Sequence, residues 1–211
     1  MKNRPDFSLY LIIDPGYRSK IKRCWKSVLV PALNAGVTAV QLRCKEKSEA
    51  EFLKLALKMH KITKKYNVPL IINDNVLIAK KINASGAHVG ACDIPVMEAR
   101  RLLGKDKIIG VSASTAAEAR AANRTGATYI GLGPVFKTKN KNTSPIPAAA
   151  LKKIIRGPGL PVVAIGGIKE YNITVLKKAG IKNFCFISEI SDAKNVYKKV
   201  KKLKELINDP A

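Results

Sequence analysis

The sequence predicts an α/β fold, a single (β/α)8 TIM barrel that occupies residues 1–211 as one domain. Eight short apolar runs alternate with eight segments of helical periodicity, and this alternation leaves no room for a second domain. The runs are continuously apolar, which is typical of parallel strands buried on both faces. An open doubly wound sheet is the alternative, but no GxGxxG motif follows the first apolar run.

The expected strands are rich in branched and aromatic residues, which suit a pleated sheet. They cover residues 8–13, 37–42, 69–73, 87–90, 107–112, 129–132, 161–165 and 183–187. The expected helices follow in turn, over about residues 19–34, 48–66, 75–83, 95–103, 115–125, 146–156, 170–179 and 191–207. In a closed barrel of this kind the chemistry lies at the carboxyl ends of the strands.

Turn and capping residues set the boundaries of these elements. The first strand stops at Pro15, within an Asp-Pro-Gly turn. Ser48 and Glu51 have the spacing of a capping box, which opens the second helix. Several helices are expected to end at a glycine, namely Gly36, Gly104, Gly126 and Gly180.

The sixth strand is the one around which the chain is organised. It breaks at Gly133 and Pro134, because proline lacks the donor that a sheet needs. Phe136 is then followed by a polar, cationic loop over residues 137–141. A buried strand that opens into ammonium and hydroxyl groups predicts an anion site, although an ordinary surface loop is the alternative.

Composition limits the partners and the compartment. The formal charge of +24, from 39 Lys and Arg against 15 Asp and Glu, suits phosphorylated small molecules, nucleic acid or an anionic membrane. The lysines are spread along the helices and no nucleic-acid signature with interleaved aromatic residues is present, so no specific nucleic acid is expected. The four cysteines form no CxxC pair, which fits the reducing cytoplasm. No membrane association is expected, since no apolar run approaches about 20 residues.

Polar residues at the ends of the second to fourth strands suggest a site for a metal and a phosphate. Gln41, Arg43 and Lys45 alternate onto one face, where the two cations could clamp an anion. Asp74 and Asp93 follow neighbouring strands, so their carboxylates can approach each other and suit Mg2+. The alternatives are a rim of surface charge for the cations and helix N-caps for the two aspartates.

The last strands suggest a second phosphate position. Gly166 and Gly167 follow the seventh strand, and Ser188 follows the eighth. In barrels the loops after these two strands commonly bind phosphate through backbone N–H groups. The glycines could equally form a tight turn into the next helix.

With these residues in view, the chain resembles the family of thiamine phosphate synthase and thiazole tautomerase. The resemblance runs nearly from end to end. It rests on VQLRCK at 40–45, IIND at 71–74, HVGACD at 88–93, GVS at 110–112, GLGPVFKT at 131–138 with Lys141, and AIGGI at 164–168.

The resemblance implies a transferase of thiamine biosynthesis that joins an aminopyrimidine diphosphate to a thiazole phosphate and releases pyrophosphate. It implies that the aminopyrimidine diphosphate is bound by Gln41, Arg43, Lys45, Asn73, Ser112 and Lys141. It implies that Asp74 and Asp93 hold Mg2+. It implies that the thiazole phosphate is bound by Thr138, Asn140, Gly167, Ile187 and Ser188. The pattern at the end of the seventh strand adds Gly166 to this position. The two histidines, His60 and His88, are interpreted as structural.

The chain departs from the usual family pattern at several positions. They are Cys44 for Glu, Asn75 for Arg, Ala91 and Cys92 for Gln and Glu, Ser114 for His, and Asn140 for Thr. None of these changes removes a metal carboxylate or a clamp cation. Two other functions stay open: a thiazole tautomerase, which would use a His at position 114, and a non-catalytic phosphate- or nucleic-acid-binding barrel. Whether the protein forms a homodimer is also left open.

Overall fold

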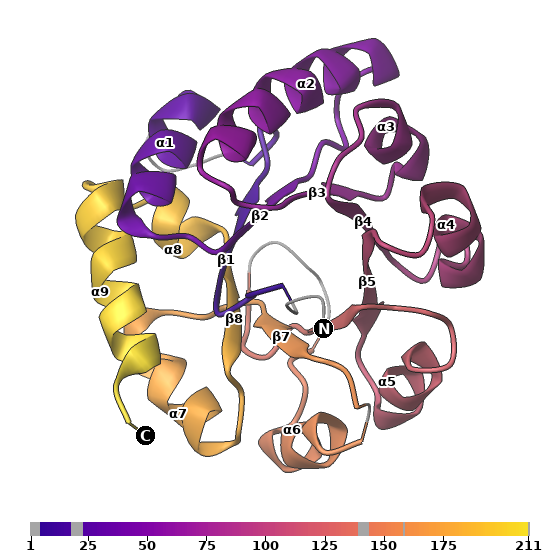
Figure 1. The fold of residues 1–211 in the computed structure, drawn as a ribbon. Coiled ribbons are helices and arrows are strands. Elements are labelled where there is room, and N and C mark those ends of the chain that lie inside the picture. Colours follow the sequence, from indigo (N-terminus) through magenta and orange to yellow (C-terminus); the bar gives the residue numbers. More distant parts are fainter. Residues whose placement is uncertain (1–4, 18–22, 139–143, 158, 211) are drawn as a thin grey trace.

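The computed structural model describes residues 5–17, 23–138, 144–157 and 159–210, without the side chains of 148 and 149. Eight parallel strands close into a barrel in the order β1 to β8, with helices around the outside (Figure 1). The strands are β1 Leu9–Ile13, β2 Ala39–Leu42, β3 Leu70–Asn73, β4 Gly86–Val89, β5 Ile108–Ala113, β6 Tyr129–Leu132, β7 Val162–Ile165 and β8 Asn183–Phe186. The predicted (β/α)8 fold is therefore confirmed.

Helices follow the strands as the periodicity predicts. They are α1 Trp25–Ala35, α2 Glu49–Lys65, α3 Val76–Lys81, α4 Val96–Leu103, α5 Ala116–Ala122, α6 Ala148–Ile155, the 3-10 helix η1 Glu170–Asn172, α7 Ile173–Lys178, α8 Ser188–Ser191 and α9 Val196–Asn208. The capping box at the start of α2 is confirmed, because the side chains of Ser48 and Glu51 each accept the other's backbone N–H. None of the described helices combines the length and apolarity that crossing a membrane requires.

Three helix boundaries differ from expectation. The last predicted helix, 191–207, starts later than expected, as α9 at Val196, because Asn195 is extended and its side chain accepts the Lys198 N–H at 3.0 Å as the N-cap. The short helix α8 before it was not predicted. Helix α1 starts at Trp25, after the extended residue Cys24, and the predicted start near residue 19 lies outside the described residues. The helix predicted over 170–179 begins as the 3-10 turn η1.

The apolar residues form two clusters. The larger lies between the strands and the helices, and the smaller fills the barrel interior with Phe7, Tyr10, Ile12, Ala39, Ile71, Tyr129, Val163 and Cys185. Tyr10 and Tyr129 bring hydroxyl groups into this inner cluster. Both are 1% exposed, so their hydroxyl groups need partners inside the barrel.

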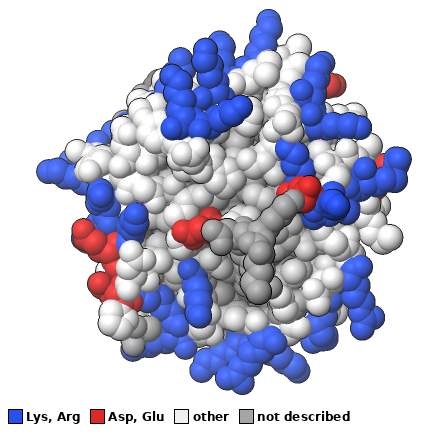
Figure 2. All heavy atoms as spheres, viewed as in Figure 1, with Lys and Arg blue, Asp and Glu red and all other residues white. Residues whose placement is uncertain are grey.

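Basic side chains are dispersed over the surface. On the face drawn in Figure 2, Lys and Arg stand all round the rim of the molecule and not in one patch. This distribution agrees with lysines that are solvated on the outer helices. All four cysteines are free thiols.

Candidate active site

The cation that follows β2 has an acidic partner. Arg43 forms an ion pair through its Nη1 with Oδ2 of Asp14, which lies just after β1 and is 10% exposed. Asp14 also accepts the Gly16 N–H at 3.0 Å, so the turn after β1 fixes its carboxylate. Sequence reasoning treated Asp14 only as a strand end and missed this role. Arg43 is therefore held at the mouth of the barrel.

Asp74 and Asp93 lie close enough to influence each other. Burial and then the neighbouring Asp93 carboxyl raise the pKa of Asp74, while Lys45 and Arg43 act to lower it. The Lys45 Nζ lies 3.6 Å from Asp74 Oδ2. Two adjacent carboxylates beside two cations form a mixed-charge centre at the ends of β2, β3 and β4.

Neither aspartate is the N-cap of the helix that follows it, so the N-cap alternative is wrong for this pair. Asn75 is the N-cap of α3, and its side chain accepts the Ile78 N–H at 2.8 Å. Pro95 occupies the corresponding position at α4. The Asp93 carboxylate instead accepts the Gly90 N–H at 2.7 Å, within the loop after β4.

The two carboxylates suit a cation that keeps other ligands. Across the described part of the chain, no group of three or more His, Cys, Asp or Glu side chains could hold a metal. Mg2+ is commonly bound by one or two carboxylates, with water and substrate phosphate oxygens filling the other positions. Burial first, and then the neighbouring Asp93, raise the pKa of Asp74, and a cation bound there would favour its charged form. The donor set therefore fits Mg2+.

A cleft of about 690 Å³ opens beside this centre. Lys45, Asn73 and Asp74 line its inner side. Leu77 and Ile94, which are 62% and 37% exposed, line the outer side. Residues of α2, α3 and α4 complete the lining, and Asp74 is the member of the aspartate pair that the cleft reaches.

A hydrogen-bonded chain in the barrel interior was missed by sequence reasoning. The Gln41 Nε2 donates to the Tyr10 Oη at 3.1 Å, and Tyr10 Oη lies 2.9 Å from Tyr129 Oη. The Tyr129 Oη is 2.9 Å from His88 Nδ1, and His88 Nε2 is 3.0 Å from Ser112 Oγ. Burial raises the pKa values of Tyr10 and Tyr129 well above 10, so both remain hydroxyl groups at neutral pH.

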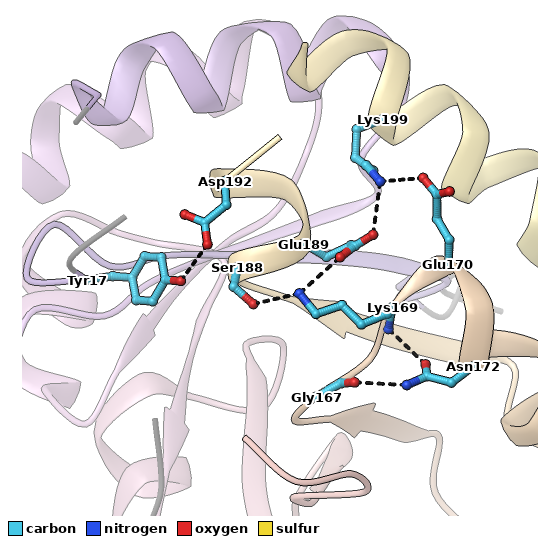
Figure 3. Close-up of polar contacts among 9 residues, drawn as sticks. All are labelled: Tyr17, Gly167, Lys169, Glu170, Asn172, Ser188, Glu189, Asp192 and Lys199. Carbon is cyan, nitrogen blue, oxygen red and sulfur yellow. Dashed lines mark hydrogen bonds and ion pairs between the residues drawn. The ribbon is translucent and has the colours of Figure 1, made fainter. Parts of the chain in front are cut away.

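Residues after β7 and β8 meet at another part of the mouth (Figure 3). The Lys169 Nζ donates to Ser188 Oγ at 3.2 Å and pairs with Glu189 Oε2 at 3.0 Å. Ile187 is the residue before α8, and its side chain is half-buried. The Tyr17 Oη donates to Asp192 at 2.8 Å, which ties the loop after β1 to the end of α8. Lys169 and Glu189 were not predicted.

The glycines after β7 have a structural requirement of their own. Both have a positive φ, 99° at Gly166 and 67° at Gly167. A Cβ on Gly167 would lie 2.6 Å from the Lys137 carbonyl oxygen, and one on Gly166 would lie 2.6 Å from Pro134 Cβ. The loop after β6 therefore packs directly on this turn. A change at Gly167 would disturb that loop whether or not a phosphate binds there.

The remaining predicted site residues are distributed as follows. Asn73 is buried on β3 and Ser112 is exposed at the end of β5. Thr138 is half-buried after β6. Asn140 and Lys141 lie outside the described residues.

Comparison with known proteins decides the family. Residues 9–190 match the family model described as thiamine monophosphate synthase.

The chain belongs to the thiamine monophosphate synthase family.

Relatives named thiamine-phosphate synthase are similar to the chain over most of their length. The protein of Methanobrevibacter smithii is 44% identical over 92% of this chain and 91% of its own. That of Clostridium acetobutylicum is 43% identical over 98% and 97%. A solved thiamine phosphate pyrophosphorylase from Pyrococcus furiosus superposes with a TM-score of 0.86 at 31% identity, over 97% of this chain and 96% of that one. The predicted resemblance to the thiamine monophosphate synthase family is confirmed.

Proposed function

We propose that this chain is a thiamine phosphate synthase. It joins 4-amino-2-methyl-5-hydroxymethylpyrimidine diphosphate to 4-methyl-5-hydroxyethylthiazole phosphate and releases pyrophosphate. The observation that carries this function is the adjacent pair Asp74 and Asp93, placed with Lys45 and Arg43 at the carboxyl ends of β2 to β4. Membership of the thiamine monophosphate synthase family supports it.

The reaction breaks the bond between the pyrimidine methylene carbon and the diphosphate oxygen. The electron pair of that bond leaves with pyrophosphate. The thiazole nitrogen then supplies an electron pair to the methylene carbon and becomes the thiazolium nitrogen. Such a displacement needs charge stabilisation on the leaving group and no nucleophilic side chain. Arg43, Lys45 and Lys141 supply that positive charge, and the barrel holds the two rings in line.

Asp74 and Asp93 would hold Mg2+, which supplies further positive charge to the diphosphate oxygens when bound. The Lys45 ammonium, 3.6 Å from Asp74, stands where it could pair with the diphosphate as well. Asn73, at the end of β3 beside these groups, is assigned to the same substrate.

The thiazole phosphate is assigned to the opposite part of the mouth. The backbone after β7 at Gly166 and Gly167, together with Ile187 and Ser188 after β8, would surround it. The loop after β6 supplies Thr138 and Asn140. The Lys169 ammonium beside Ser188 supports an anion there.

One assay tests the function. The purified protein is mixed with both precursors and Mg2+, and thiamine phosphate and pyrophosphate are measured in parallel. Equal amounts of the two products are expected, and neither should form when one precursor is omitted. No product from both precursors, together with RNA binding that falls steeply with salt, would instead support the non-catalytic alternative.

A further inference from the structure

The hydrogen-bonded chain inside the barrel ends at two predicted substrate-binding side chains. It runs from Gln41 on β2, through Tyr10 and Tyr129, to His88 on β4 and Ser112 on β5. The four donor–acceptor distances lie between 2.9 and 3.1 Å. Only Ser112, at the end that faces the mouth, is exposed. The interior of the barrel therefore connects the two side chains, Gln41 and Ser112, that the proposed function assigns to the aminopyrimidine substrate.

The direction of donation along this chain follows from its first member. The Gln41 amide nitrogen can only donate, so the Tyr10 oxygen accepts from it. The Tyr10 proton then has Tyr129 as its partner, and the Tyr129 proton has His88 Nδ1. Every buried hydroxyl in this order accepts one hydrogen bond and donates one. With this order of donation, His88 would carry its proton on Nε2 and donate it to the Ser112 oxygen.

Two glycines make room for the central pair. In the sheet register Gly110 of β5 stands between His88 of β4 and Tyr129 of β6. A Cβ at Gly110 would lie 2.2 Å from Tyr129 Cζ and 2.4 Å from His88 Nδ1. A Cβ at Gly131 would lie 2.9 Å from His88 Cε1. The two rings can therefore meet only because neighbouring strands carry no side chain at this level.

We propose that Tyr10, Tyr129 and His88 are positioning residues that fix the hydrogen-bonding pattern offered to the aminopyrimidine ring. Since Ser112 accepts from His88, its own proton is directed to an acceptor such as a ring nitrogen. Since the Gln41 amide nitrogen is bound to Tyr10, its oxygen is the atom that can accept from the exocyclic amine. This inference rests on the proposed function, in which Gln41 and Ser112 bind this substrate.

The first test reads the histidine tautomer and needs no turnover. The chain has only two histidines, so a His60→Gln variant leaves His88 alone in a long-range proton–nitrogen NMR spectrum. The spectrum is recorded at about pH 8, above the ordinary histidine pKa of roughly 6.5. An Nε2–H imidazole is expected. An Nδ1–H imidazole, or a mixture of the two, would overturn the direction of donation.

The second test interrupts the chain at its centre. Tyr129→Phe removes one oxygen and both of its hydrogen bonds, and Tyr171→Phe, at a tyrosine that is 85% exposed, is the control. We expect kcat/KM for the aminopyrimidine diphosphate to fall about ten-fold or more, as for the loss of a hydrogen bond of about 1.4 kcal/mol. The KM for the thiazole phosphate should stay unchanged.

The outcomes separate the two proposals. Wild-type protein without turnover would refute the proposed function. The His88 tautomer would still show whether donation along the hydrogen-bonded chain runs from Gln41 to Ser112. Turnover that is unaffected by Tyr129→Phe, or lowered equally for both substrates, would refute positioning of the aminopyrimidine. If Tyr129→Phe does not fold, Tyr10→Phe, which breaks the adjacent link, is judged by the same two kinetic constants.

Discussion

Lys199 of α9 links two acidic side chains that come from different loops at the mouth. Its Nζ lies 2.5 Å from Glu170 of η1 and 3.0 Å from Glu189 of α8 (Figure 3). Lys202 pairs with the other carboxylate oxygen of Glu170, and Lys169 pairs with the other carboxylate oxygen of Glu189. Lys199 is thus the only one of the three that contacts both acids among the ion pairs of the described residues. Lys199→Met should weaken the attachment of α9 to these two loops, while Lys169 still joins the loop after β7 to α8.

The expected loss of stability follows from partial burial. Lys199 is 24% exposed, Glu170 22% and Glu189 12%. Exposed ion pairs contribute about 0–1 kcal/mol and breaking a fully buried pair costs about 3–5 kcal/mol. An intermediate loss of about 1–3 kcal/mol is expected, which for a chain of this length lowers Tm by about 2–12 °C.

The pH dependence of this loss has a definite sign. Burial, the largest single influence, lowers the pKa of Lys199, but Glu170 and Glu189 together outweigh it and raise the pKa above its ordinary value. The stabilisation is therefore present below about pH 10.4, the ordinary lysine pKa, and is lost as the pH rises through the folded pKa. Burial, the largest single influence, raises the pKa of Glu170, but Lys199 and Lys202 together outweigh it. The pKa of Glu170 is therefore lowered overall. Its contribution is present above about pH 4.3 and is lost as the pH falls through the folded pKa.

Thermal unfolding of wild type and Lys199→Met, scanned over pH, measures this contribution. The exposed neighbour Lys198→Met serves as the control. The difference in Tm should be largest near neutral pH and shrink toward both extremes. A double-mutant cycle with Glu189→Gln should show a coupling on the order of 1 kcal/mol. Equal Tm values for Lys199→Met and Lys198→Met at pH 7 would refute the assigned network.

Three further variants test other parts of the site. Asp93→Asn should abolish most turnover in Mg2+, and near wild-type rates would contradict the metal assignment. The free energy of unfolding in metal-free buffer should fall little, because one of two neighbouring carboxylates loses its charge. Lys141→Ala should lower the rate about ten- to a hundred-fold and Lys139→Ala far less, since a charged hydrogen bond to phosphate contributes about 1.5–3 kcal/mol; equal rates would exclude Lys141 as the diphosphate ligand. Gly110→Ala should destabilise the protein by about 1–3 kcal/mol in chemical denaturation, because its Cβ would lie 2.2 Å from Tyr129 Cζ. The control Gly157→Ala should not, since its Cβ would lie 3.5 Å from the nearest atom, Arg120 Cγ. The same loss of stability in both variants would contradict the close packing at Gly110.

The barrel could be predicted from the sequence because its signals are local and repeated. Each strand is a short apolar run, and glycines or a capping box mark many of the helix ends. The helix α8 was missed because four residues are too few for a periodic pattern. The start of α9 was predicted too early, at residue 191, because the cap at Asn195 depends on a side-chain hydrogen bond that spacing alone does not reveal.

The candidate site was predictable where residues follow a strand, and less so where partners come from distant strands. Asp74 and Asp93 were placed together by adjacency of β3 and β4. Asp14 was missed as the partner of Arg43, since that pair depends on the direction of two side chains across β1 and β2. The chain from Tyr10 to His88 was also missed, because its members read as ordinary core residues within apolar strands. The glycine at 110, in register between His88 and Tyr129, is the one signal that could have revealed it.

The backbone of Asp74 has a consequence for how this activity could be lost in evolution. Asp74 has a φ of 64°, in the left-handed region that glycine occupies with the least strain. Its carboxylate is also raised in pKa by burial and by Asp93, so the folded protein gains nothing from that charge without a ligand. Replacement by glycine would therefore keep the turn and relieve the repulsion. If Asp74 holds Mg2+ as proposed, a lineage supplied with the product from outside would lose catalysis by this one substitution and keep an intact barrel.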